Sequence, residues 1–153
     1  MQPLSTLNLV IAAFAVTGPM THVLELPGSM RLDGALWLAV QQELYRGWGA
    51  LFGPVDILAL LTTIVLAFFR RGTARRFRLT VAAAVTYGLM IAMFFVMVAP
   101  VNRAVVGWTA ATLPPNWESY RLQWEGGYLI AAVLSIIALL FIAAAWFRER
   151  TAP

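Results

Sequence analysis

Residues 79–101 (LTVAAAVTYGLMIAMFFVMVAPV) form one unbroken run without a charged side chain. A helix needs about 20 mostly apolar residues to cross the hydrocarbon core of a bilayer, and this run has that length. Two further runs resemble it. Residues 51–69 (LFGPVDILALLTTIVLAFF) contain one charge, at Asp56, and residues 128–147 (YLIAAVLSIIALLFIAAAWF) contain none. We therefore expect three helices that span a membrane.

The first apolar run, residues 4–26 (LSTLNLVIAAFAVTGPMTHVLEL), is less pure because His22 and Glu25 lie near its end. A signal peptide needs a positively charged start and a cleavage site with small residues. Residues 1–8 carry no Arg, so we interpret this run as a retained fourth helix. The predicted fold is all-α: an integral membrane four-helix bundle that forms a single domain over residues 1–153.

The composition supports this prediction and excludes several classes of site. Hydrophobic residues make up 61% of the chain and charged residues 12%, whereas a soluble domain has roughly 45–50% and 25%. The absence of Cys excludes disulfides and thiolate chemistry within the chain. The single His, with two or three carboxylates, could hold one metal ion, but we predict no cofactor.

The Arg residues predict how the helices are oriented. The connector 70–78 (RRGTARRFR) carries five Arg, and Arg148 and Arg150 follow the last apolar run. Positively charged short loops stay on the cytoplasmic side of a membrane. We therefore expect both termini in the cytoplasm and the connectors 27–50 and 102–127 outside the inner (plasma) membrane. The basic connector is typical of contact with anionic lipid, so no nucleic-acid partner is expected.

Both outer connectors contain short helical patterns. Asp33 can cap a helix over residues 33–45, because its side chain accepts from free backbone amides. A second helix is expected over residues 115–125, and the two glycines at 126–127 predict a bend after it. Neither helix is long enough to span a bilayer, so both are expected at the membrane interface.

Five of the six Trp residues also lie in these outer connectors. They are Trp37, Trp48, Trp108, Trp117 and Trp124. Indole rings gather at headgroup depth and form an aromatic belt, which is one interpretation. The other is that the rings line a cavity for an aromatic substrate.

Polar side chains collect at the outer ends of the predicted helices, which meet because consecutive spans alternate in direction. His22 and Glu25 lie three residues apart and therefore share a helix face. Asp56 either caps its helix or faces His22 at the same depth. A His at such a mouth could act as a general base. The candidate catalytic residues are His22, Glu25, Arg103 and Arg121, and the candidate substrate-binding residues are Asp56, Asn102, Trp124, Glu125 and Tyr128.

Three segments carry a family resemblance: THVLELPGSMRLDGALWLAVQQELYRGWG (21–49), APVNRAVVGW (99–108) and TLPPNWESYRLQWEGGY (112–128). In order and spacing they resemble the anthrone oxygenase-like family of small four-helix membrane proteins. The resemblance implies oxidation of a polycyclic phenol by dioxygen without an evident cofactor. The positions that it implies are His22, Glu25, Asn102, Trp124 and Glu125. Where relatives have a His after the Trp-Glu pair, this chain has Tyr128.

Two hypotheses of function follow. In the first, the outer mouth binds a lipophilic aromatic or quinone-like molecule from the membrane. His22, oriented by Glu25, would take a proton, and Arg103 or Arg121 would stabilise the anion that reacts with dioxygen. In the second, the protein is a non-enzymatic accessory or structural subunit. Its partners would then be membrane lipid and a homo-oligomer or a larger membrane complex.

Overall fold

A computed structural model describes residues 2–150, and that part of the chain is helical without a strand. The elements are α1 (Gln2–Ser29), α2 (Gly34–Ala39), the π-helical turn η1 (Val40–Leu44), α3 (Trp48–Phe69), α4 (Ala74–Met93), the π-helical turn η2 (Phe94–Val98), α5 (Ala99–Val105) and α6 (Trp117–Arg150). The predicted all-α class is therefore confirmed.

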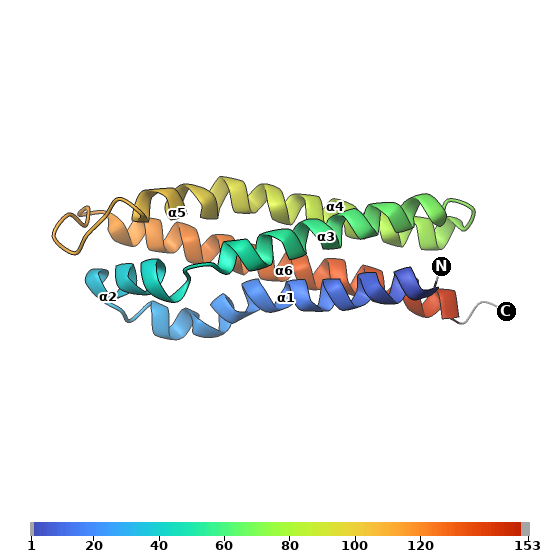
Figure 1. The fold of residues 1–153 in the computed structure, drawn as a ribbon, viewed down its shortest axis with the longest axis horizontal. Helices are drawn as coiled ribbons and strands as arrows, with labels where there is room; N and C mark the ends of the chain where they lie inside the picture. The colour runs from blue at the N-terminus through green and yellow to red at the C-terminus, as the bar shows by residue number, and fades with distance from the viewer. Residues whose placement is uncertain (1, 151–153) are drawn as a thin grey trace.

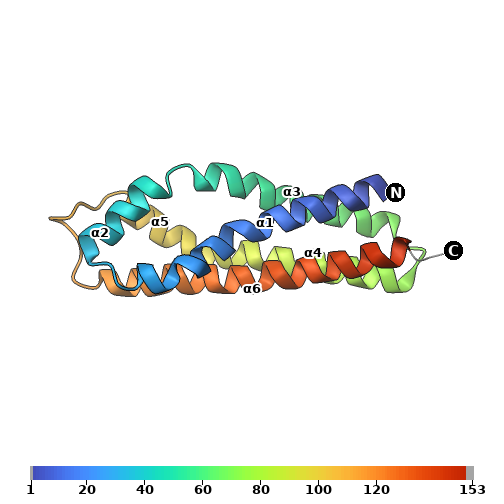
Figure 2. The same cartoon turned by 90° about the horizontal axis from the view of Figure 1, so that it is seen from below.

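Four helical stretches are long and apolar enough to cross a membrane: α1, α3, α6 and the continuous Ala74–Val105 formed by α4, η2 and α5. They contain the four apolar runs expected from the sequence. Figures 1 and 2 show them side by side along the long axis of the molecule. Their outer faces carry exposed apolar side chains such as Leu61, Val85 and Leu140. This is the pattern of a multi-pass membrane protein.

The core between the helices is built from small residues. α6 packs against α1 and α4, and α3 packs against the same two helices. The buried cluster between them contains Ala12, Ala15, Ala59, Ala83, Ala131 and Ala138, with Tyr87, Met90 and Ile142. Small side chains let membrane helices approach closely, which gives packing without a large apolar core.

The structure corrects the predicted end of the second outer connector. Residues 115–125 do not form a separate interfacial helix, because α6 begins at Trp117 and runs without interruption to Arg150. The predicted bend at 126–127 is therefore wrong. A Cβ atom on Gly127 would lie 2.7 Å from Val98 Cγ2 and 3.0 Å from Met97 Cβ. Glycine at this position allows α6 to approach η2.

The first outer connector agrees with the predicted helix over 33–45. Asp33 caps α2, and its Oδ1 accepts from the backbone N–H of Leu36 at 2.8 Å. The chain then turns at Gly47, whose φ of 86° is a left-handed value that suits glycine. Because α3 begins directly afterwards at Trp48, Asp56 lies in the third turn of α3. The interpretation of Asp56 as a helix cap is therefore wrong.

A buried ion pair joins the helices at the opposite end of the molecule. Arg70 is 3% exposed, and its Nη2 donates to Glu149 Oε2 at 2.8 Å and to Ser5 Oγ at 3.1 Å. Its Nη1 donates to Thr80 Oγ1 at 2.8 Å. The end of α3 is thereby tied to α1, α4 and α6.

Candidate functional site

Two neighbouring cavities lie at the end of the helices where α1 leads into α2. The inner cavity, between α1, α3, α4, η2 and α6, has a volume of about 230 Å³. The outer cavity, beneath η1 and α5, has a volume of about 610 Å³. Both are lined by His22, Trp48, Gly49, Phe94 and Tyr128. These five residues form the wall between the two cavities.

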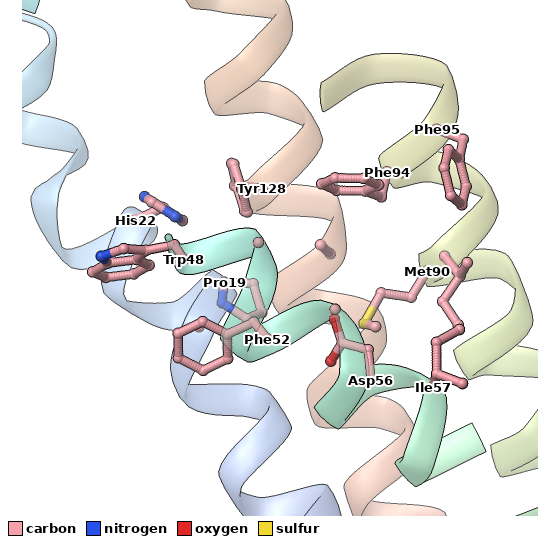
Figure 3. Close-up of a pocket in the computed structure, with 15 residues that line it drawn as sticks. Pro19, His22, Trp48, Phe52, Asp56, Ile57, Met90, Phe94, Phe95 and Tyr128 are labelled. Atoms are coloured by element: carbon pink, nitrogen blue, oxygen red, sulfur yellow. The ribbon is translucent and has the colours of Figure 1, made fainter. Parts of the chain in front are cut away.

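The inner cavity is mainly apolar and aromatic (Figure 3). Phe52 and Trp48 come from α3, and Phe94 and Phe95 come from η2. Phe95 is 61% exposed. The neighbouring lining residues Gly53 and Ile57 are exposed as well. The cavity therefore reaches the outer surface of the helices between α3 and η2, where lipid would lie if these helices cross a membrane.

Aromatic rings surround His22, which is 3% exposed. The centroid of its ring lies 3.9 Å from that of Tyr128 and 4.7 Å from those of Tyr45 and Trp124. Its Nδ1 is buried, has no hydrogen-bond partner among residues 2–150, and lies 3.7 Å from Glu25 Oε2. The structure thus brings the two residues of the H-x-x-E pattern close together, at ion-pair distance.

Glu25 is also engaged by a residue that the sequence did not single out. The Tyr45 hydroxyl donates to Glu25 Oε2 at 2.6 Å. Burial raises the pKa of Tyr45, and the hydrogen bond to Glu25 raises it further. Tyr45 therefore stays neutral at ordinary pH and holds the Glu25 carboxylate beside His22.

Asp56 lines the inner cavity together with His22 (Figure 3). Its Oδ1 is buried and has no hydrogen-bond partner in the described part of the chain. Tyr128 lines the same cavity, and the buried Tyr87 hydroxyl likewise has no hydrogen-bond partner among residues 2–150. The alternative that places Asp56 and His22 around one space is therefore the one that the structure supports.

Two further candidates belong to the outer cavity. Asn102 and Trp124 both line it, and the Trp124 indole N–H donates to Asn102 Oδ1 at 2.8 Å. Gln42 lines the same cavity, and its Nε2 donates to the carbonyl oxygens of Val105 at 2.7 Å and Trp108 at 3.0 Å. The outer cavity is therefore the more polar of the two.

The remaining charged candidates line neither cavity. Glu125 is buried and accepts a hydrogen bond from the Ser29 hydroxyl. Arg121 is buried as well; its Nη1 donates to the Leu32 carbonyl oxygen at 2.9 Å. Arg103 is exposed at the end of α5. The two Arg residues expected to stabilise an anion are therefore not placed to do so in either cavity.

The Trp residues of this end pack into the protein. Trp37 is 0% exposed and Trp124 2%, whereas rings of a belt would face the lipid headgroups. Trp48 lines both cavities, and Trp108 and Trp124 line the outer one. The burial of Trp37 and Trp124 favours the interpretation in which indole rings build and line cavities.

Sequence reasoning missed Tyr45 and Phe94, and it named Trp48 only as one of the indole rings that could line a cavity; in the folded chain all three meet or flank His22. Tyr45 and Trp48 lie on either side of Gly47, and the rings of the two contact each other with centroids 5.3 Å apart. The sequence signal for this contact was the glycine between the two aromatic residues, because glycine suits a left-handed turn. Phe94 lies in a π-helical turn, which no pattern in the apolar run 79–101 indicates.

Searches for metal ligands and for relatives gave no positive result. Among residues 2–150, no group of three or more His, Asp and Glu side chains is placed to hold a metal ion. Comparison with protein-family models, curated proteins and solved structures found no significant match.

Proposed function

We propose that this protein is an integral membrane four-helix bundle that binds a lipophilic aromatic small molecule in the inner cavity. The observation that carries the proposal is an aromatic-lined cavity that opens on the lateral surface of the long apolar helices, between α3 and η2. Ligand sites are typically concave and apolar, with a few convergent polar groups. Here His22, Asp56 and Tyr128 supply those groups.

The Arg distribution supports an orientation for this site. The connector 70–78 lies at the end of the helices opposite the two cavities. Under the positive-inside rule that end faces the cytoplasm. Both termini would then be cytoplasmic, and the cavities would lie in the outer half of the inner membrane.

The resemblance to anthrone oxygenases would add a reaction in which His22 accepts a proton from a bound phenol. His22 lies in the wall shared by both cavities, which suits that role. Neither Arg103 nor Arg121, the two residues expected to stabilise an anion, lines a cavity, and Arg46, which lines the outer cavity, is paired with Glu43 at 3.0 Å. We therefore restrict the proposal to binding. The accessory-subunit role stays the alternative prediction.

Photolabelling tests the proposal. A small neutral probe, tritiated benzophenone, is irradiated with the full-length protein in lipid nanodiscs, and labelled peptides are mapped by mass spectrometry. Gly53→Phe adds a ring at a residue that lines the cavity, and a Cβ there meets no atom within 4 Å. Gly88→Phe is the matched control, since a Cβ on Gly88 is equally free and Gly88 lines neither cavity.

We expect saturable label in the peptides that contain Phe52 and Phe94, retained in Gly88→Phe and lost in Gly53→Phe. Label that is not saturable and is spread evenly over the lipid-facing residues would contradict the binding site. Equal labelling of Gly53→Phe and Gly88→Phe would also contradict the binding site.

A further inference from the structure

Asp56 is an isolated carboxylate at membrane depth. It lies in the third turn of α3, and its buried Oδ1 has no hydrogen-bond partner among residues 2–150. No Arg forms an ion pair with it there either, whereas Glu149 of α6 is paired with Arg70 and the buried Glu125 of α6 accepts a hydrogen bond from Ser29. Burying a charge without a partner in a membrane is costly, so such residues usually have a functional role.

The groups that face Asp56 carry no fixed positive charge. From α1 the inner cavity presents His22, and from α6 it presents Tyr128. From α4 comes the buried Tyr87, whose hydroxyl has no hydrogen-bond partner in the described chain. A ligand that fills this cavity therefore meets one acidic group and no Arg.

Aromatic rings make up much of the remaining lining. Trp48 and Phe52 come from α3, Phe94 and Phe95 from η2, and Tyr128 from α6 (Figure 3). The faces of aromatic rings carry partial negative charge and attract cations, most strongly where water is excluded. The rings and the carboxylate thus favour the same sign of ligand charge.

We propose that the inner cavity selects a lipophilic aromatic cation, such as an aromatic amine or pyridinium, whose positive group lies against the Asp56 carboxylate. This inference rests on the proposed binding function and names its ligand class. A proton can bind the same carboxylate in place of the cation. Cation and proton therefore compete for the same group, and the cation binds more weakly as the pH falls.

A pair of probes with the same shape and different charge tests the inference. N-methyl-4-phenylpyridinium carries a permanent positive charge, and 4-methylbiphenyl is its neutral counterpart. Tritiated forms of both are bound to the full-length protein in nanodiscs of neutral lipid. The variants are Asp56→Asn, Asp56→Glu and the control Glu118→Gln, which removes a carboxylate whose side chain is 67% exposed outside both cavities.

We expect Asp56→Asn to weaken binding of the pyridinium about tenfold or more, because a desolvated charge loses its counter-charge. Glu118→Gln should keep the affinity within about twofold of wild type, well inside the 1.4 kcal/mol of a tenfold change. Asp56→Glu, which keeps the negative charge, should retain more of the pyridinium affinity than Asp56→Asn. In Asp56→Asn, binding of 4-methylbiphenyl should fall by less than binding of the pyridinium. In the wild-type protein, which needs no substitution, acidification should weaken binding of the pyridinium alone.

The outcomes separate the two proposals. If 4-methylbiphenyl binds as tightly as the pyridinium, and neither acidification nor Asp56→Asn changes the affinity of the pyridinium, the cation selectivity is overturned and the aromatic site stands. If neither probe binds the folded wild-type protein, the aromatic site itself is refuted.

Discussion

Adding one methyl group at Gly127 tests how closely α6 packs against η2. A Cβ on Gly127 would lie 2.7 Å from Val98 Cγ2 and 3.0 Å from Met97 Cβ, both closer than packed carbon atoms normally approach. Overpacking of this kind costs about 1–3 kcal/mol. The gain in helix propensity from Gly to Ala, roughly 1 kcal/mol, offsets part of that cost.

Gly126 supplies the matched control, because it is the neighbouring residue in the same helix. Its Cβ would lie 3.6 Å from Met97 Cε, which is an ordinary contact. Gly126→Ala therefore gains the same propensity without the overpacking. The free energy of unfolding of Gly127→Ala should then lie below that of Gly126→Ala by about 1–3 kcal/mol.

The assay is equilibrium unfolding in mixed micelles with increasing SDS, followed by far-UV circular dichroism. The difference between the two variants cancels the propensity term and isolates the contact with η2. Equal stabilities, or a more stable Gly127→Ala, would refute the close approach and would fit a loosely packed bend at these glycines.

Three further predictions concern stability. Glu149→Gln leaves the buried Arg70 without its counter-charge and should lower the free energy of unfolding by about 3–5 kcal/mol. The control Glu43→Gln, in an exposed pair, should lower it by less than about 1 kcal/mol. Unfolding of both variants in SDS measures the difference. Since the pKa of Tyr45 is raised in the folded protein, the neutral ring contributes stability that is lost as the pH rises above about 10, the ordinary tyrosine pKa. Tyr45→Phe should flatten that alkaline decline, and an unchanged slope would contradict the burial of the hydroxyl. Trp124→Phe removes an indole N–H that donates a hydrogen bond and should cost about 1–3 kcal/mol, read from the same unfolding curves; no loss would contradict that bond.

The sequence could predict the four long helices because lipid excludes charge so strongly that apolar runs stand out. It could not predict where the helices end. Residues 117–127 are polar enough to be taken for a separate connector, yet they continue α6 because Trp124 and Gly127 pack against neighbouring elements. Helix ends outside the apolar zone depend on such tertiary contacts, which hydropathy does not report.

The site was predictable in its location but not in its composition. Alternation of the helices is sufficient to bring His22 and Asp56 to one end. The depth of Asp56, however, depends on the left-handed Gly47, which starts α3 at Trp48. A local backbone angle therefore decided whether a carboxylate caps a helix or faces a cavity.

The same alternation brings the Arg-rich connector 70–78 to the end of the molecule that holds Glu149. Arg70 differs from its neighbours in the 70–78 connector because its position at the end of α3 turns its guanidinium toward Ser5, Thr80 and Glu149. Charge counts describe a loop as a whole. They do not show which Arg is buried.

Native mass spectrometry of the protein, extracted gently with its own lipid, tests the central claim most directly. Wild type and Gly88→Phe should each carry one bound aromatic compound besides lipid, identified by fragmentation, and Gly53→Phe should have lost it. If Gly53→Phe carries the same bound species as the other two proteins, the inner cavity is not the binding site.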